Sequence, residues 1–143
     1  MSEAARRETL AIVYALEPEL SAQEFRAVLV ASTLGERRPV DEPERLERML
    51  RHADLIVTAR HDAKLVGVSR AITDFAFCCY LSDLAVEVAY QHQGIGKRLV
   101  AETQAAAGAA AMLILIAAPA SASYYPKIGM KQMSGCWVIP RSP

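Results

Sequence analysis

The sequence predicts a single α/β domain in which helices cover both faces of a mixed sheet. Its 143 residues are 52% hydrophobic and 22% charged, a composition typical of one globular domain with a substantial core. Short aliphatic runs that suit strands alternate with segments whose apolar residues recur every three or four positions, as in helices. The predicted order is β-α-α-β-β-β-α-β-α-β, and neither an internal repeat nor a linker interrupts residues 1–143.

The N-terminal part of the chain predicts one strand and two helices. Thr9 to Leu16 is rich in aliphatic residues and favours the strand. Ser21, followed three positions later by Glu24, is typical of a helix start, and we expect Gly35 to end that helix. The apolar positions between Leu46 and Leu50 predict a second, short helix.

The rest of the chain predicts five strands and two helices. The tripeptide His61-Asp62-Ala63 is expected to join two strands into a hairpin. The predicted strands are Asp54 to Arg60, Lys64 to Thr73, Ala76 to Val86, a buried strand from Met112 to Ala117, and Met133 to Ile139. The predicted helices run from Gly96 to about Ala107 and from Ser123 over a short distance.

Charge and cysteine content exclude several classes of protein. Lys plus Arg and Asp plus Glu both number 16, so no general attraction to nucleic acid is expected. Three cysteines, of which Cys78 and Cys79 are adjacent, predict neither a disulfide framework nor a metal site, and they suit the cytoplasm. No signal peptide is expected from the pattern of the first residues. The uncharged stretch Thr103 to Pro126 is mostly alanine interrupted by glycine, proline and serine, so no membrane span is expected.

The stretch Leu81 to Val100 carries the clearest functional pattern. It begins as an apolar strand, passes through a polar turn and enters a helix at Gly94 and Gly96. Glycine lets a backbone lie close to a ligand, and the first amides of a helix have no intrahelical partner. The positive end of the helix dipole adds to this, so the stretch predicts an anion site suited to phosphates.

Two common nucleotide motifs do not fit this stretch. A P-loop requires glycine at position 91 and Ser or Thr after the lysine, where this chain has Gln91 and Arg98. A dinucleotide fingerprint requires a third glycine, where this chain has Leu99. It also requires an acidic residue about 20 positions later, where Leu113 to Ala118 is wholly apolar.

The segment Gln91-His92-Gln93-Gly94-Ile95-Gly96 resembles the acyl-CoA-binding motif Q/R-x-x-G-x-G/A of the GNAT N-acetyltransferase superfamily. The later segment Tyr124 to Met130 resembles the Phe-Tyr-x-Lys-x-Gly-Phe segment of the same superfamily, and the matched parts span roughly Asp54 to Met130. The resemblance implies a mixed, mostly antiparallel sheet of six to seven strands with about four helices. It also implies an enzyme that transfers an acetyl group directly from acetyl-CoA to a primary amine.

The resemblance further implies which residues bind acetyl-CoA. The thioester carbonyl would lie near the backbone amide of Val86, on a strand splayed from its neighbour. Lys97 and Arg98 would help to neutralise phosphates, or would be ordinary exposed helix residues. The implied set is Leu84, Ala85, Val86, Gln91, His92, Gln93, Gly94, Ile95, Gly96, Lys97 and Arg98.

Two residues are candidates for proton transfer. The resemblance makes Tyr125 the proton donor to the departing CoA sulfur, with Tyr124 as a packing residue. If the helix begins before Ser123, Pro126 would kink it and the two tyrosines would exchange roles. Asp83 is predicted to share a strand face with Leu81 and Ala85, and it either serves as the general base or bonds to a neighbouring loop.

Other candidates have simpler explanations. Asp74 would bind a cationic substrate or cap a turn, Cys79 would carry an acetyl group or be a buried core residue, and His92 is expected to face solvent. Ala118 occupies a position where the family often has an Asn that contacts the pantetheine arm. A catalytically idle acyl-CoA-binding sensor or interaction module is therefore the alternative to the enzyme.

The sequence leaves the acceptor and the oligomeric state open. A small-molecule amine is the preferred acceptor, a protein amine is the alternative, and the neutral net charge disfavours tRNA. The apolar tail Cys136 to Ile139 is compatible with a homodimer formed through the C-terminal strands or with a self-contained core.

Overall fold

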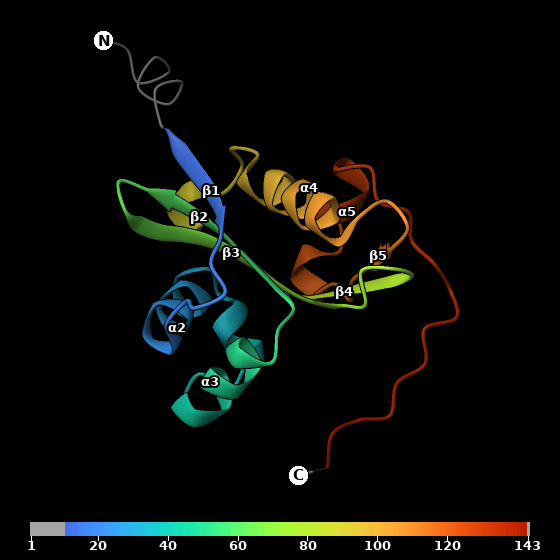
Figure 1. The fold of residues 1–143 in the computed structure, drawn as a ribbon, viewed down its shortest axis with the longest axis horizontal. Coiled ribbons are helices and arrows are strands. Elements are labelled where there is room, and N and C mark those ends of the chain that lie inside the picture. The colour runs from blue at the N-terminus through green and yellow to red at the C-terminus, as the bar shows by residue number, and fades with distance from the viewer. Residues whose placement is uncertain (1–10, 143) are drawn as a thin grey trace.

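The computed structural model describes residues 11–142, which form a five-stranded sheet flanked by helices (Figure 1). The strands are β1 (Ile12–Leu16), β2 (Leu55–His61), β3 (Lys64–Thr73), β4 (Cys78–Val86) and β5 (Met112–Ile114). They lie in chain order across the sheet, where β1 to β4 are antiparallel neighbours and β5 runs parallel to β4. The predicted fold class is confirmed, although the described residues form fewer strands than the six to seven expected.

Four helices and three 3-10 turns accompany the strands in the described chain. The helices are α2 (Ala22–Ala31), α3 (Pro43–Arg51), α4 (Ile95–Ala107) and α5 (Tyr124–Lys127), and the turns are η1 (Leu34–Arg37), η2 (Val88–Tyr90) and η3 (Pro119–Ser121). Helices α2 and α3 pack on one face of the sheet and α4 packs on the other (Figure 1). The prediction of helices on both faces is therefore confirmed.

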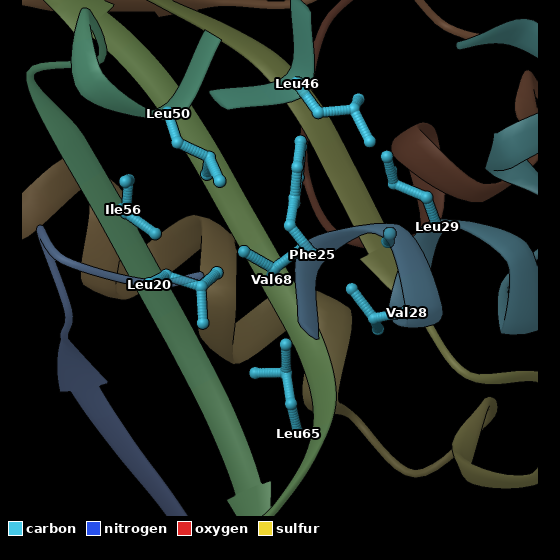
Figure 2. Close-up of a cluster of buried hydrophobic side chains, with 10 residues drawn as sticks. Leu20, Phe25, Val28, Leu29, Leu46, Leu50, Ile56, Leu65 and Val68 are labelled. Atoms are coloured by element: carbon cyan, nitrogen blue, oxygen red, sulfur yellow. The ribbon is translucent and has the colours of Figure 1, made fainter. Parts of the chain in front are cut away.

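The core between the sheet and the helices α2 and α3 follows the predicted helical spacing (Figure 2). Phe25 and Leu29 of α2 and Leu46 of α3 are at most 1% exposed, and they pack on Val68 and Ala85 of the sheet. Burying an aromatic side chain such as Phe25 contributes about 1.5–3 kcal/mol. This core fixes α2, α3 and the turn between them on one face of the sheet, and Arg38 follows that turn.

Helix α4 is held to the opposite face by apolar packing and one buried polar link. Ile95 and Leu99 pack against apolar side chains of β2 and β3. The Thr103 hydroxyl donates to the Leu99 carbonyl at 2.7 Å, so the Ser69 hydroxyl of β3 donates to Thr103 at 2.6 Å. This link fixes the position of α4 along the sheet, and with it the position of its N-terminus.

The predicted start of α2 is confirmed, but its end differs. The Glu24 amide donates to the Ser21 hydroxyl at 3.1 Å, whereas the Glu24 carboxylate accepts a bond from Arg60 at 2.6 Å instead of returning to Ser21. The helix ends at Ala31, and Gly35 lies in the following 3-10 turn. The hairpin predicted at residues 61–63 is confirmed, with Asp62 and Ala63 at φ 48° and 69°.

Strand β4 contains a β-bulge that the sequence pattern does not reveal. Asp83 pairs with Arg70 and Leu81 pairs with Ala71, which leaves Ser82 as the extra residue. Residues opposite each other in an antiparallel pair share a face, and neighbours along a strand do not. Leu81 therefore lies on the face opposite to Asp83 and Ala85, and the prediction that all three share a face was wrong.

The C-terminal strands are the other departure from prediction. Strand β5 is shorter than Met112 to Ala117 and is not buried, since Met112 is 56% and Ile114 46% exposed. The segment Met133 to Ile139 forms no strand, and Trp137 is 93% exposed. At the other end, the strand predicted from Thr9 is seen from Ile12 onward, and residues 9 and 10 lie outside the described range.

Candidate functional site

The loop before α4 forms one wall of a groove of about 430 Å³, which we call the loop groove. Its other walls come from the end of β4, from η3 and from α5. The lining residues are Leu84, Val86, Tyr90, Gln91, His92, Gly94, Ile95, Gly96, Lys97, Ala120, Ser121, Ser123, Tyr124, Tyr125, Lys127 and Ile128.

The backbone of this loop delivers free amides to the groove. Gly94 is the N-cap residue of α4 at φ 83°, a left-handed conformation that costs glycine little. The first intrahelical bond runs from the Arg98 amide to the Gly94 carbonyl at 3.0 Å, so the amides before Arg98 have no partner within the helix. The Gln91 side-chain amide donates to the Val86 carbonyl at 2.9 Å and ties the loop to the end of β4. The start of α4 therefore presents amides without intrahelical partners, the feature on which the predicted anion site depends.

Because Gly96 has no side chain, the first turn of α4 and the ring of Tyr124 can lie close together in the groove. A Cβ added there would lie 2.5 Å from the hydroxyl oxygen of Tyr124, a distance that forces one of them to move. Burial raises the pKa of Tyr124, and a hydrogen bond with the backbone amide of Lys97 opposes that shift. Tyr124 therefore lies against the first turn of α4.

A gap opens beside β4 where its pairing with β5 ends. The parallel pairing stops at Tyr80 and Ile114, while β4 continues to Val86. The Glu87 amide donates to the Val66 carbonyl of β3 at 2.8 Å. Because such bonds alternate along an antiparallel pair, the amides of Leu84 and Val86 face away from β3, into the gap. This exposed backbone forms the inner wall of the loop groove.

A second cavity of about 770 Å³, the arginine cavity, lies on the far side of Tyr125. Leu84, Ser121 and Tyr125 line both cavities. The rest of its lining comes from η1 and the loop after it, from α3, β3 and β4, from residues 115–118 and from the C-terminal segment. Its lining is Leu34, Glu36, Arg37, Arg38, Pro39, Glu42, Arg45, Met49, Arg70, Tyr80, Leu81, Ser82, Leu84, Leu115, Ile116, Ala118, Ser121, Tyr125, Val138 and Arg141.

Tyr125 lies in the first turn of α5, at the junction of the two cavities. Ser123 is the N-cap residue of α5, so Pro126 falls within the first turn, where proline is tolerated. The ring of Tyr125 meets that of Tyr124 edge to face, with 5.3 Å between centroids. Burial is the main cause that raises the pKa of Tyr125, Tyr124 adds to it, and the charge of Arg38 opposes it. The phenol therefore stays protonated at neutral pH.

Asp83 lies beneath the arginine cavity with no exposed surface. Its two carboxylate oxygens accept hydrogen bonds from the Nε atoms of Arg38 and Arg70. Arg38 also donates to the Ser82 carbonyl at 2.8 Å, and Arg70 donates to the Ser82 hydroxyl at 3.1 Å and to the Met49 carbonyl at 3.3 Å. Hydrogen bonds to Asp83 and to the bulge residue Ser82 therefore hold the guanidinium groups of Arg38 and Arg70 in place.

Comparison with known proteins places this arrangement in a family. A family model described as the acetyltransferase (GNAT) domain matches residues 18–135, most of the chain. The chain belongs to the GNAT acetyltransferase family. It is an N-acetyltransferase by this membership, and no protein of curated function matches its sequence significantly.

Solved GNAT structures share the fold at low sequence identity. A GNAT family acetyltransferase from Streptococcus pneumoniae is 23% identical with a TM-score of 0.74, and 92% of this chain covers 100% of it. A probable acetyltransferase from Staphylococcus aureus is 20% identical with a TM-score of 0.75, again with 92% and 100% covered. An aminoglycoside N-acetyltransferase solved in complex with CoA is 14% identical with a TM-score of 0.71, with 92% and 95% covered.

The structure of this GNAT domain brings most of the predicted binding residues together. Those that line the loop groove are Leu84, Val86, Gln91, His92, Gly94, Ile95, Gly96, Lys97 and Tyr125. Ala85 is buried in the core with α2 and α3, and Gln93 is exposed outside the groove lining. Arg98 pairs with Glu102 at 2.7 Å, and its guanidinium lies 4.8 Å from the ring centroid of Tyr14. The side chains of Ala85 and Arg98 are therefore directed to other contacts, whereas Gln93 is only exposed.

The remaining candidates have structural surroundings that explain them. The Asp74 carboxylate accepts bonds from the amides of Ala76, Phe77 and Cys78, which lower its pKa to about 2, so it caps a turn. Cys79 is fully buried, and burial raises the pKa of its thiol. Residues 11–142 contain no cluster of three or more metal-binding side chains. In the same range, no helix combines the length and apolarity that crossing a bilayer requires.

Sequence reasoning missed the arginines of the second cavity. Arg38 and Arg70 come from a loop and from β3, and Asp83 comes from β4. No fixed spacing links these positions. The only signal in the sequence was the presence of charged residues inside otherwise apolar strands, which is uncommon unless the charge is paired.

Proposed function

We propose that this N-acetyltransferase transfers an acetyl group directly from acetyl-CoA to a primary amine of a small-molecule acceptor. The observation that carries the proposal is the position of Tyr125, which lines both the loop groove and the arginine cavity. A single hydroxyl can therefore serve a reaction between a thioester in the groove and an amine in the cavity. The arginine cavity, at about 770 Å³, is in the usual size range for small-molecule sites.

The loop groove has the features that bind acetyl-CoA in this proposal. The amides of Ile95 and Gly96, which have no partner within the helix, receive the phosphates, and the Lys97 side chain adds positive charge at the same place. Gly94 and Gly96 allow close approach of the ligand to the backbone. The amides of Leu84 and Val86, which face the gap beside β4, donate hydrogen bonds to the pantetheine arm and to the thioester carbonyl.

The chemistry requires an oxyanion donor and a proton donor. The neutral amine attacks the thioester carbonyl, whose developing negative charge is stabilised by the backbone amide of Val86. The carbon–sulfur bond then breaks, and Tyr125 gives its proton to the departing thiolate. The nitrogen loses its extra proton to water in the open cavity.

In this proposal Asp83 holds Arg38 in position and does not contact the amine. Both of its oxygens already accept bonds from guanidinium groups, and its side chain has no exposed surface. Direct proton abstraction by Asp83, the role predicted from the sequence, would require one of these bonds to open. A pH profile of kcat in Asp83→Asn decides between the roles, because only a general base would remove the acidic limb of that profile.

The substitution Tyr125→Phe tests the proposed function. It keeps the ring and removes the proton donor, so we expect kcat to fall by about 10²- to 10⁴-fold. The dissociation constant of acetyl-CoA should change little, because the backbone contacts of the groove remain. Thiol release in a screen of amine acceptors measures the first quantity, and calorimetry measures the second.

The matched control is Tyr124→Phe, which removes a hydroxyl from the adjacent ring. It should retain most activity, because Tyr124 lines the loop groove but not the arginine cavity. Full activity in Tyr125→Phe would contradict the assigned donor. Tight acetyl-CoA binding without acetylation of any small-molecule or protein amine would support the idle acyl-CoA-binding module instead.

A further inference from the structure

Positive charge dominates the arginine cavity, although the whole chain has zero formal net charge. Five arginines line the cavity, against the carboxylates of Glu36 and Glu42 and the buried carboxylate of Asp83 beneath. The arginines are Arg37, Arg38, Arg45, Arg70 and Arg141. They come from η1, the loop after it, α3, β3 and the C-terminal segment, so the fold gathers them from separate parts of the chain.

Internal ion pairs neutralise only part of this charge. Glu42 lies 3.3 Å from Arg45, and the single charge of Asp83 is shared between two guanidinium groups. Within residues 11–142, Arg37 and Arg141 have no ion-pair partner. The cavity therefore keeps a positive potential, which concave, low-dielectric walls strengthen.

Arg38 is the arginine best prepared to bind a ligand. Its Nε donates to Asp83, one Nη donates to the Arg37 carbonyl at 2.8 Å, and the other donates to the Ser82 carbonyl at 2.8 Å. A guanidinium has five N–H groups, so two remain available. Its side chain is 21% exposed, unlike that of Arg70 at 7%. The bonds that hold Arg38 reduce the entropy it loses when it binds an anion.

Arg38 also lies close to the proposed point of reaction. Arg38 and Tyr125 line the same cavity, and the charge of Arg38 acts on the Tyr125 hydroxyl. If Arg38 binds the anionic group of an acceptor, the rest of that acceptor can therefore extend through the same cavity toward Tyr125.

We propose that the acceptor is a primary amine that also carries an anionic group, a carboxylate or a phosphate, and that Arg38 binds this group. The proposal rests on the proposed function, since it names the class of substrate for that site. Arg37 and Arg141 add attraction at the exposed rim, where they favour capture of an anion. Polycationic amines such as aminoglycosides are disfavoured here, although a protein of the same fold bears that activity in its name.

Matched pairs of acceptors test the proposal with the full chain and acetyl-CoA. Phosphoethanolamine is compared with ethanolamine, β-alanine with β-alaninamide, and larger amino acids and amino-sugar phosphates with their uncharged counterparts. Kanamycin represents polycations. We expect the anionic member of the preferred pair to have a kcat/KM at least about tenfold higher, and the better of the phosphate and carboxylate arms identifies the anion.

Two variants connect the preference to the cavity. In Arg38→Gln, KM for the anionic acceptor should rise at least about tenfold, and kcat/KM should fall at least about tenfold more for the anionic acceptor than for its uncharged counterpart. Because Arg38→Gln also weakens the support of Asp83, the exposed Arg37→Glu provides a second test that leaves the core unchanged. Its matched control is Arg48→Glu, an equal charge change at an exposed position of α3 outside the cavity lining.

The outcomes separate this inference from the proposed function. Faster acetylation of uncharged or cationic amines than of anionic ones overturns the inference and leaves the acetyl transfer intact. Equal loss of anionic acceptor turnover in Arg37→Glu and Arg48→Glu also overturns it, since overall charge would then explain the effect. Failure to acetylate any amine, despite acetyl-CoA binding, overturns the proposed function and this inference with it.

Discussion

The substitution Gly96→Ala tests the geometry of the loop groove most directly. The added Cβ would lie 2.5 Å from the Tyr124 hydroxyl oxygen and 3.3 Å from its Cζ, so the tyrosine must shift. Alanine is favoured over glycine within a helix by about 1 kcal/mol, which offsets much of the cost of that shift. We therefore expect the free energy of unfolding to change by no more than about 1 kcal/mol.

Acetyl-CoA binding should respond much more strongly than stability does. The methyl group occupies the space through which a phosphate would approach the free amides at the start of α4. We expect the dissociation constant of acetyl-CoA to rise at least about tenfold, or ~1.4 kcal/mol. Calorimetry of binding and urea unfolding of the same preparations separate the two effects.

A double variant tests whether the clash with Tyr124 is understood. Tyr124→Phe removes the hydroxyl, so Gly96→Ala/Tyr124→Phe should regain any stability that Gly96→Ala loses, while acetyl-CoA binding stays weak. Recovery of binding in the double variant would show that displacement of Tyr124, and not the methyl group, weakens binding. Unchanged affinity in Gly96→Ala alone would refute the assignment of the groove to the phosphates.

Gly94 offers a comparison in which the added Cβ contacts no other atom. Nothing lies within 4 Å of a Cβ added at Gly94, but its φ of 83° strains any other residue. Gly108, at the other end of α4, has a φ of 93° and equally open surroundings. Gly94→Ala should lower stability by about 1–2 kcal/mol. Gly108→Ala should lower it by about 1–3 kcal/mol, because a φ of 93° with a ψ of 155° is essentially restricted to glycine. Only Gly94→Ala should weaken acetyl-CoA binding.

Three further outcomes are expected. Thr103→Val should lower the free energy of unfolding by about 1–3 kcal/mol in urea titrations, because the buried Ser69 hydroxyl loses its acceptor, and Ser69→Ala/Thr103→Val should recover part of that loss. Since its raised pKa keeps Tyr125 protonated to higher pH, kcat should show no alkaline loss below about pH 10, and an inflection near pH 8 would contradict its role as the donor. Light scattering should show a dimer, because the exposed C-terminal segment and the free edge of β5 leave apolar surface uncovered. Trp137→Ser should weaken this dimer, and a monomer mass at high micromolar concentration would reject the prediction.

The elements that the sequence predicted well are those whose information is local. The pair Ser21 and Glu24 defined the start of α2, and the short link at residues 61–63 defined the hairpin. Helix α4 was placed within one residue at its start, because glycines and the preceding polar turn mark that position. Each of these signals is contained within a few neighbouring residues.

The strands at the C-terminal end were predicted less well because strand formation depends on neighbours. The apolar run from Met133 to Ile139 suits a strand, yet strand preference mostly measures packing against a paired surface. In the described chain β4 pairs with only three residues of β5, and no strand pairs with the outer edge of β5. Without such a partner, Trp137 and Ile139 remain more than 90% exposed.

The bulge at Ser82 shows how one backbone irregularity changes the expected chemistry. Simple alternation placed Asp83 on the same face as Leu81 and left open whether its carboxylate is the general base or bonds to a neighbouring loop. The extra residue turns Asp83 to the side of Arg70 and Arg38, which saturate both of its oxygens. A buried carboxylate requires such partners, so its burial and its two ion pairs have one common cause.

The two halves of the candidate site differ in how they are encoded. The loop groove uses backbone amides and glycines from one continuous segment, so a short motif is sufficient to reveal it. The arginine cavity combines side chains from five separate segments, and its charge exists only after the fold has brought them together. An acceptor site of this kind can change its specificity by single substitutions at the rim without disturbing the groove. Arg37 and Arg141 are therefore the positions at which the choice of acceptor is most open to alteration, while Arg38, held by Asp83 and Ser82, is tied to the sheet.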